Sequence, residues 1–386
     1  MAGSARAPVR VAAVGWQLGA RGEGEAAAAA EVGAGTGAGT GVWIGAGAGV
    51  GAEAGPNAGA GTLRKEIEAR LLAVKEAGAR LVVLPGYAGS ILAKVLAAGK
   101  DLAGTNDEVE ATGASVGQGP TSGRAQGQVH AAAVEPIRDL VVFPAQEKAY
   151  LAWASDWARR LRGFLVPGSV LVAEGKTIYH QAYLLSPDGE VLGRQRQTHL
   201  RAAERARGLA AGEELLVFPT EIGSIGLVVG GDAWYPEVSR ILTLQGADIL
   251  VAPLTLLIPY PKERQWAGMW QEVQQNQTFA IECGLEGCLG GLEFHAQTAV
   301  MAPCEMTPGQ TGYLGDPALI SGQITAGRQT GILGPTLICD LDFSARQELI
   351  ANYDILSLLN LDLYRRYFPG LYRLVLRNGG EGAGHE

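Results

Sequence analysis

The first 85 residues show two different spacings of apolar side chains. Residues 9–18 have the density of apolar and β-branched residues that is typical of a buried strand. In residues 62–77, apolar side chains recur at helical spacing with charged residues between them, which predicts a helix. Residues 79–85 return to a largely apolar run that ends at a proline. Strand, helix and strand in this order predict an α/β unit.

The same alternation continues along the rest of the chain. Further strands are predicted at 163–172, 178–186, 222–230, 247–253, 294–303 and 335–342, further helices at 146–162 and 236–246, and a helix followed by a strand within 263–292. The segment Pro187-Asp-Gly189 is typical of a hairpin turn between two strands. This order of elements predicts an α/β fold with mixed sheets.

Two long segments interrupt the pattern. Residues 20–61 form an Ala/Gly-rich, low-complexity tract with almost no large side chains to bury, and residues 100–135 are polar and rich in Gly, Ser and Thr. Both segments are predicted to be loop insertions, and the first is predicted to be disordered.

Charge and composition exclude several kinds of partner. With 31 Lys+Arg against 39 Asp+Glu the net charge is −8, which gives no electrostatic reason to bind nucleic acid. The four cysteines are too few for a disulfide framework and complete no zinc motif, so we expect a cytoplasmic protein without metal or cofactor. The longest apolar run, 249–260, contains two prolines and is too short to cross a bilayer, so no membrane association is expected.

Motifs for nucleotide binding and for two hydrolase classes fail on inspection. Residues 47–52 match a dinucleotide fingerprint, but they lie inside the repetitive tract, where chance matches are expected. Gly175-Lys-Thr177 resembles the end of a phosphate loop, yet Val170 stands where that loop requires glycine. The chain also contains no G-x-S-x-G elbow and no H-E-x-x-H helix, so serine hydrolase and zinc protease chemistry have no support.

Three other segments carry a more specific signal. Residues 82–85 read Val-Val-Leu-Pro, residues 187–200 run from Pro-Asp-Gly to Gln-Thr-His-Leu, and residues 230–237 read Gly-Gly-Asp-Ala-Trp-Tyr-Pro-Glu, followed by Gly-Ala-Asp-Ile-Leu at 246–250. In order and spacing these segments resemble the nitrilase superfamily of carbon-nitrogen hydrolases. The third segment is the most specific, because the family reads Cys-x-Asp-x-x-Phe/Tyr-Pro-Glu there.

The resemblance implies a catalytic unit of Cys, Glu and Lys. In that family a Cys nucleophile attacks an amide or nitrile carbon, a Glu acts as general base and a Lys stabilises the developing anion. In this chain the three places are occupied by Gly86 instead of Glu, Gln197 instead of Lys and Gly230 instead of Cys. Because the flanks of each position match without gaps, we expect that the chain has lost carbon-nitrogen hydrolysis.

Three residues that are retained are expected in the same pocket, namely Glu204, Asp232 and Trp234. Glu204 stands where the family keeps a second glutamate, and two interpretations are equally supported: a lone pocket carboxylate, or a helix-start glutamate paired with Arg201 or Arg205. Trp234 either lines the mouth of the pocket or packs as an ordinary core or interface aromatic.

The remaining candidates have structural interpretations. Asp232 or Glu237 is expected to cap the helix that begins at the following proline. His199 is expected to be packed or hydrogen-bonded rather than a metal ligand, and Cys283 and Cys288 to be small buried thiols.

The resemblance also implies the overall organisation. It predicts a four-layer αββα sandwich, formed by a single domain over residues 1–370 with the two insertions, followed by a tail at 371–386, and assembled as a homodimer or larger homo-oligomer. The function it suggests is an inactive homologue of amidases and nitrilases that binds a small amide- or nitrile-like ligand or serves as a subunit. Two alternatives stay open: an active amidase or nitrilase that uses a non-standard site, and a structural or regulatory subunit with no ligand.

Overall fold

The computed structural model describes residues 7–17, 59–97, 139–256, 262–289, 292–315 and 336–380. The predicted insertions at 20–61 and 100–135 lie outside the described residues, except that helix α2 (Gly59–Glu76) begins within the last residues of the first. The predicted tail is described as far as residue 380, and helix α11 (Leu361–Gly380) runs through the boundary that we placed at residue 370.

The first sheet is built on the N-terminal strand. Among the described residues it has eight strands, in the order β16 (Thr336–Leu341), β1 (Val9–Val14), β3 (Leu81–Val83), β5 (Phe164–Val166), β7 (Thr177–Leu185), β6 (Ser169–Glu174) and β4 (Val141–Val142), with β8 (Val191–Arg196) paired to β7. β1, β3 and β5 run parallel, whereas β16 is antiparallel to β1. The predicted hairpin is confirmed, since β7 and β8 pair antiparallel across the turn at Gly189, whose φ of 79° suits glycine.

The second sheet is centred on a long strand, β12 (Phe279–Leu289). Its described strands follow the order β15 (Tyr313–Gly315), β14 (Ala299–Met301), β12, β11 (Ile249–Leu254), β10 (Ile225–Leu227) and β9 (Val217–Phe218), and both β13 (Leu292–His295) and β2 (Trp16–Gln17) pair with β12. The two sheets are therefore mixed, as the sequence predicts.

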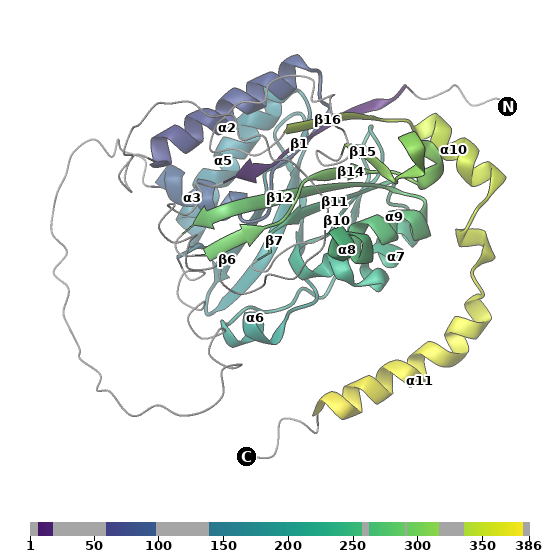
Figure 1. The fold of residues 1–386 in the computed structure, drawn as a ribbon. Helices are drawn as coiled ribbons and strands as arrows, with labels where there is room; N and C mark the ends of the chain where they lie inside the picture. The colour runs from purple at the N-terminus through teal and green to yellow at the C-terminus, as the bar shows by residue number, and fades with distance from the viewer. Residues whose placement is uncertain are drawn as a thin grey trace, which may run out of the picture.

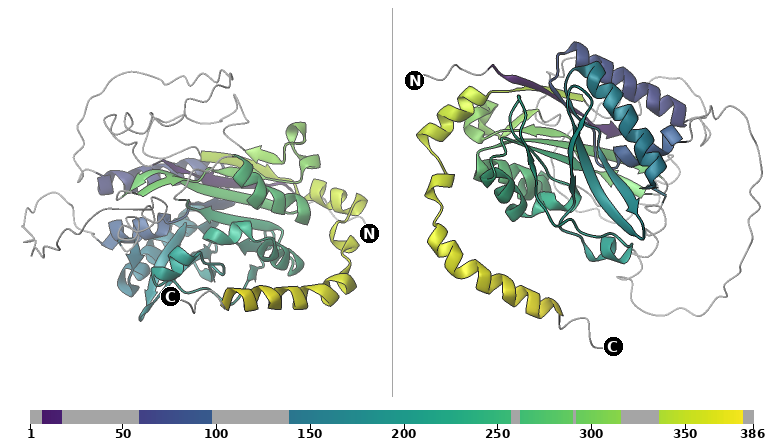
Figure 2. Two further views of the ribbon diagram at one scale, coloured as in Figure 1. Left: turned by 60° about the horizontal axis from the view of Figure 1, so that its bottom comes forward. Right: turned by 180° about the vertical axis from the view of Figure 1, so that it is seen from behind.

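Helices cover the outer face of each sheet. Those beside the first sheet are α2, α3 (Ala88–Ala97) and α5 (Pro144–Leu161), and those beside the second are α7 (Pro236–Leu244), α8 (Lys262–Gln265), the π-helix η2 (Trp266–Trp270) and α9 (Gln271–Asn276). The other described helices are α6 (Ala202–Ala206), the 3-10 turns η1 (Gly230–Trp234), η3 (Cys304–Met306), η4 (Pro308–Gln310) and η5 (Leu356–Leu358), and α10 (Phe343–Asn352) before α11. Figures 1 and 2 show the α2, α3, α5 group and the α7, α8, α9 group on opposite sides of the paired sheets.

Three buried clusters hold these layers together. One joins α2, α3 and α5 to the first sheet, a second fills the space between the two sheets, and a third joins the second sheet to α7 and α9. Strand β1 illustrates the arrangement, because Val11 and Ala13 face the second sheet while Ala12 and Val14 face the helices. The four-layer αββα sandwich is thus confirmed.

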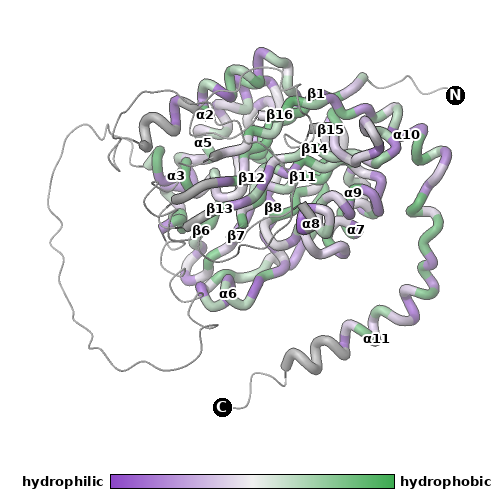
Figure 3. The backbone as a smooth tube through the Cα atoms, viewed as in Figure 1, coloured by the Kyte–Doolittle hydropathy of each residue, from purple (hydrophilic) through white to green (hydrophobic). Residues whose placement is uncertain are grey.

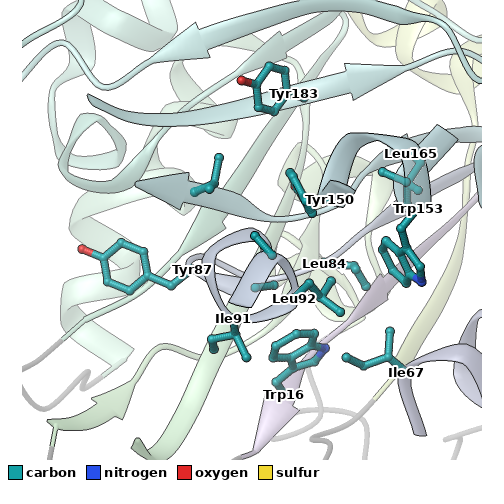
Figure 4. Close-up of a cluster of buried hydrophobic side chains, with 14 of the residues drawn as sticks. Trp16, Ile67, Leu84, Tyr87, Ile91, Leu92, Tyr150, Trp153, Leu165 and Tyr183 are labelled. Carbon is teal, nitrogen blue, oxygen red and sulfur yellow. The ribbon is translucent and has the colours of Figure 1, made fainter. Parts of the chain in front are cut away.

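The helix-side cluster on the first sheet includes an element that the hydrophobic pattern missed. Figure 4 shows Trp16, Ile67 and Leu92 packed together from a strand and two helices, with Tyr87 at the edge of the group. Leu92 belongs to α3, in which Ala88 to Ala93 are all buried. Six consecutive buried residues cover more than one helical turn, so this part of α3 has no polar stripe and gives no helical periodicity.

Three predicted strands are each divided by the tertiary structure. One of them, 294–303, is divided into β13 and β14, which both pair with β12, and in the other two the chain changes its neighbours. The described part of the strand predicted at 9–18 forms β1 and β2, which separate at Gly15 and join different sheets. Residues 163–172 form β5 and β6, separated by Pro167 and by Gly168 at a φ of 90°. In both cases the apolar run is continuous because both halves are buried, although the second half does not have the same set of partner strands as the first.

The C-terminal helix α11 differs from the other long helices. Most of its described side chains are exposed, and Figure 3 shows hydrophobic and hydrophilic residues alternating along it. It touches α7 through the hydroxyl of Tyr372, which donates to Glu237 at 2.7 Å. In the part of the chain that the structure describes, no helix is long and apolar enough to span a membrane.

Candidate functional site

Two of the three substituted positions are in contact. Gln197 follows β8 directly, and Gly230 is the first residue of η1, just after β10 of the other sheet. A Cβ atom added to Gly230 would lie 2.6 Å from Oε1 of Gln197 and 3.0 Å from Cε1 of His180. The place at which a side chain of residue 230 would start is therefore filled by Gln197 and His180.

The third position, Gly86, lies three residues after the end of β3. Its N–H donates to the carbonyl of Leu254 at 3.1 Å, and an added Cβ would lie 2.5 Å from the carbonyl carbon of Leu254. Such an approach is possible only for glycine. The next residue on each segment, Tyr87 and Thr255, lines the same cavity as Gly230. Of the three positions, only Gly230 lines the cavity; Gln197 contacts Gly230, and Gly86 is connected to the cavity through its neighbour Tyr87.

The cavity at this place has a volume of about 190 Å³. Its lining residues come from both sheets and from the turns that follow them: Tyr87, His180, His199, Arg201, Glu204, Gly230, Gly231, Trp234, Tyr235, Thr255, Leu256 and Arg264. Small-molecule sites commonly measure about 300–1,000 Å³, so this cavity suits a small ligand.

A chain of buried hydrogen bonds forms the wall behind Gly230. The main-chain N–H of Tyr87 donates to Oγ of Ser169 at 2.9 Å, and this Oγ lies 2.7 Å from Nε2 of His180. Nδ1 of His180 lies 2.6 Å from Oε1 of Gln197, whose Nε2 donates to the carbonyl of His199 at 2.7 Å. An amide oxygen only accepts, so Nδ1 of His180 carries the proton and Nε2 accepts from the Ser169 hydroxyl.

Burial keeps the titratable groups of this hydrogen-bonded wall, His180 and Tyr87, uncharged. His180 is 2% exposed, and burial lowers the pKa of its imidazole despite the opposing effects of Gln197 and Glu204. The ring is therefore neutral at neutral pH, with both nitrogens occupied. Burial also raises the pKa of the Tyr87 hydroxyl to about 12, so this group is a neutral donor in the cavity.

Glu204 is the helix-start glutamate of α6 paired with Arg201, which is one of the two interpretations that the sequence left open, although it also lies in the cavity wall. Its Oε2 accepts from the N–H of Arg201 at 2.7 Å and from Nε2 of Gln197 at 3.4 Å, while Oε1 accepts from the Arg201 guanidinium at 3.2 Å. Burial raises the pKa of Glu204, but the bonds and charge of Arg201 outweigh it and hold this pKa below its usual value.

Asp232 lies behind the cavity and is not among its lining residues. It is fully buried, and its carboxylate accepts from the N–H of Thr198 at 2.8 Å and from the N–H of His199 at 2.7 Å. It thereby ties the segment after β8 to η1. The prediction that Asp232 or Glu237 caps α7 is wrong, because that helix starts at Pro236 after an N-cap, Tyr235, with no side-chain hydrogen bond.

Aromatic residues form the outer part of the cavity. Trp234 lines it, and its indole N–H donates to the carbonyl of Arg264 at 3.1 Å. The ring of His199 stacks on that of Tyr235 with centroids 3.8 Å apart, and Nδ1 of His199 lies 3.2 Å from Oδ1 of Asp232. His199 is therefore a packed, hydrogen-bonded histidine, as expected, and it also faces the cavity.

Several cavity residues were not anticipated from the sequence. Tyr87, His180, Thr255 and Arg264 reach the cavity from four separate segments. His180 had a detectable signal, since it is a polar residue in the middle of a predicted buried strand. Tyr87 adopts a φ of 56°, which is strained for a tyrosine and has no sequence signature.

The thiols and the potential metal ligands lie elsewhere. Cys283, Cys304 and Cys339 are free and do not line the cavity, and the side chain of Cys288 is outside the described residues. Cys283 is buried, as expected, and its thiol donates to the carbonyl of Val83 at 3.4 Å. Among the described residues, no group of three or more His, Cys, Asp or Glu side chains could hold a metal ion.

Solved structures resemble this fold at low sequence identity. An amidase from Nesterenkonia sp. AN1, whose active-site cysteine carries the acetamide moiety of fluoroacetamide, matches with a TM-score of 0.55 and 17% identity, covering 95% of this chain and 100% of that one. A carbon-nitrogen hydrolase from Helicobacter pylori matches with a TM-score of 0.52 and 15% identity, over 92% and 97% of the two chains. These similarities concern the fold.

Curated relatives match parts of the sequence. A probable hydrolase of Bacillus subtilis is 28% identical over 43% of this chain and 33% of its own length. A nitrilase of Pyrococcus abyssi is 26% identical over 38% of this chain and 54% of its own length. An N-carbamoylputrescine amidase of Arabidopsis thaliana is 23% identical over 56% and 70%. The chain thus spans about a third to a half of the first two relatives.

The family assignment follows from the sequence as a whole. The family model named carbon-nitrogen hydrolase matches residues 48–304, which is more than half of the chain. This match includes all three substituted positions, Gly86, Gln197 and Gly230. The chain belongs to the carbon-nitrogen hydrolase family, the nitrilase superfamily.

Proposed function

We propose that this chain binds a small amide-like molecule in the cavity and does not hydrolyse it. The observation that carries the proposal is the contact at Gly230, where Oε1 of Gln197 and Cε1 of His180 fill the place of a side chain. By the resemblance in sequence, this is the place of the family's nucleophilic cysteine. A glycine supplies no nucleophile, and the neighbouring Gln197 carries no charge to stabilise an anion.

None of the three thiols described by the structure is suited to replace the nucleophilic cysteine of the family. Burial raises the pKa of Cys283 far above its usual value and that of Cys339 to about 12, and burial also raises the pKa of Cys304. A reactive cysteine needs a lowered pKa and access to the substrate. None of these three residues lines the cavity.

Two basic groups on the described wall of the cavity are already engaged, and the third, the His199 imidazole, is stacked on Tyr235 and bonded through Nδ1. Both ring nitrogens of His180 form hydrogen bonds. The Glu204 carboxylate accepts three hydrogen bonds, two from Arg201 and one from Gln197. At the place of the family's glutamate, the backbone of Leu254 occupies the space where a side chain of residue 86 would begin. General base catalysis requires a basic atom within reach of the reacting proton.

The groups needed to hold a ligand remain. The hydroxyls of Tyr87 and Thr255 and the guanidinium of Arg201 supply polar contacts, while the rings of Trp234 and Tyr235 supply apolar surface. A concave site with a few polar groups among aromatic residues is typical of small-molecule binding. Relatives of this chain carry the names nitrilase and amidase, which supports an amide-like ligand.

We also propose that the chain assembles into a homodimer or a larger homo-oligomer in the cytoplasm. The support is a set of large apolar side chains on or just before α11, each at least 45% exposed: Leu358, Leu361, Leu363, Tyr367, Phe368, Leu371 and Tyr372. Apolar surface of this extent on one helix favours burial against another protein surface. Light scattering of the full chain checks this assembly.

The experiment that tests the proposed function measures turnover and binding on the same sample. Purified protein is offered aliphatic and aromatic amides, N-carbamoyl amines and nitriles, and ammonia release is followed. We expect no turnover, together with a higher melting temperature in the presence of at least one amide. A ligand at about 100 times its Kd should add about 2.7 kcal/mol to the free energy of unfolding.

Three variants make this experiment decisive. Gly230→Cys restores the thiol, and we expect it to remain inactive because base and cation are still missing; Gly208→Cys is its control, since Gly208 also has a positive φ but nothing within 4 Å of an added Cβ. Ammonia release by the wild-type chain that disappears in Glu204→Ala would contradict the proposal, because a contaminating enzyme would not respond to that change. Such a result would favour an amidase with a non-standard site.

A further inference from the structure

The cavity has more positive than negative charge on its walls. Its lining includes two arginines, Arg201 and Arg264, and one carboxylate, Glu204. The hydroxyl of Tyr87 stays protonated at neutral pH, and His180 is neutral. A charged ligand therefore meets a site whose fixed charges favour an anion.

The one carboxylate of the wall is already engaged. Glu204 is 5% exposed, and its two oxygens accept from the main chain and guanidinium of Arg201 and from the amide of Gln197. An ammonium group of a ligand would have to compete with Arg201 for these oxygens. Glu204 and Arg201 thus form a neutral pair that gives little attraction for a cation.

Arg264 is in the opposite situation. It belongs to α8, is exposed, and lines the cavity beside Trp234, whose indole N–H binds its carbonyl oxygen. Among the side chains that the structure describes, no carboxylate forms an ion pair with its guanidinium. A hydrated guanidinium at the mouth of a cavity can form a bidentate bond with a carboxylate at little cost in desolvation.

The cavity is therefore polarised from its mouth to its inner end. Tyr87, His180 and Gly230 are buried and form the inner end, whereas Arg264 is exposed at the mouth. We propose that the ligand is a short molecule with two different ends, an amide-like group bound near Tyr87 and a carboxylate bound by Arg264. This inference rests on the proposed function, because it specifies the class of ligand that the same cavity binds.

The test uses three molecules that share an amide end and differ in the charge of the other end. Succinamate carries a carboxylate, succinamide carries a second amide, and 4-aminobutanamide carries an ammonium group. Binding to the full chain is measured by isothermal titration calorimetry at fixed ionic strength. We expect succinamate to bind at least about tenfold more tightly than either of the other two, as a charge-assisted hydrogen bond allows.

Variants of the arginine locate the effect. Arg264→Gln should remove the preference for succinamate while leaving the affinity for succinamide within about twofold, and Arg264→Glu should reverse the preference toward 4-aminobutanamide. Arg64→Gln is the matched control, because Arg64 is also exposed but lies on α2 and lines no part of the cavity. This control should retain the preference.

The outcomes separate the two proposals. If succinamide or 4-aminobutanamide binds as tightly as succinamate, or if Arg264→Gln keeps the preference, the ligand class is wrong and the proposed function stands. If ammonia is released from any of the three, the proposed function is wrong and the ligand class falls with it. If none of the three binds, the ligand class is wrong, and the wider amide panel decides the proposed function.

Discussion

Nδ1 of His180 lies 2.6 Å from Oε1 of Gln197, and this hydrogen bond connects β7 to the residue that follows β8 behind the cavity. It determines the state of both side chains. The amide oxygen fixes the proton of the imidazole on Nδ1, and the imidazole holds the amide over Gly230. A lysine at residue 197 would instead require Nδ1 of His180 to accept, with the ring proton moved to Nε2.

Removal of this bond should destabilise the fold. Gln197→Leu keeps a similar volume but leaves the buried N–H of His180 without its acceptor, so we expect the free energy of unfolding to fall by about 1–3 kcal/mol in urea titrations. Gln271→Leu is the control, because Gln271 is exposed on α9 and should change the same quantity by less than about 0.5 kcal/mol. Equal effects of the two variants would show that the hydrogen bond contributes nothing to stability.

Gly86 should tolerate no side chain. In Gly86→Ala the new methyl group would lie 2.5 Å from the backbone of Leu254, so either strand end must shift, and we expect a loss of about 1–3 kcal/mol or more in thermal unfolding. Gly370→Ala has no atom within 4 Å of the added Cβ and lies in helix α11, where alanine should stabilise slightly. A Gly86→Ala protein as stable as the wild type would mean that the two sheets meet less closely here.

Asp232 should act on the cavity through the segment that it binds. Asp232→Ala leaves the N–H groups of Thr198 and His199 unpaired in a buried place, which should lower the free energy of unfolding by about 2–5 kcal/mol. Asp232→Asn keeps one acceptor oxygen and should lose less. Ligand affinity should weaken in the same order, since His199 lines the cavity. If both variants bind the ligand as the wild type does, Asp232 does not position this wall.

Glu272 should make stability depend on pH. Burial between α9 and α7 raises its pKa to about 7, with Arg240 and Asn276 opposing and Glu237 adding to the shift. A carboxyl whose pKa is higher in the folded state favours folding below its unfolded value of about 4.5, and this contribution is lost as the pH rises toward 7.

The matching variant is Glu272→Gln, which keeps the shape of the protonated acid. Relative to the wild type it should gain about 1–3 kcal/mol in free energy of unfolding between pH 4.5 and pH 8, measured by denaturation at a series of pH values. A difference between the two proteins that stays constant over this range would mean that Glu272 has an ordinary pKa.

Much of the architecture could be predicted because it depends on local patterns. The helices near 62–77, 146–162 and 236–246 appear as α2, α5 and α7, since each presents one apolar stripe to a sheet. The elements that could not be predicted are those whose surroundings change along the chain. The first six residues of α3 are all buried, and residues 9–17 pass from one sheet to the other. The division of the chain into residues 1–370 and a tail stays a prediction.

The sequence by itself determined the family, the four-layer sandwich and the identity of the residues at three strand ends, because motif order and residue type are properties of the linear chain. Only the tertiary structure decided that Gly86 lies against the backbone of Leu254, that His180 and Gln197 fill the space over Gly230, and that Arg264 faces the same cavity. These contacts join strand ends of two sheets and a helix that are distant in sequence. Their geometry depends on how the layers pack, which no local pattern of residues encodes.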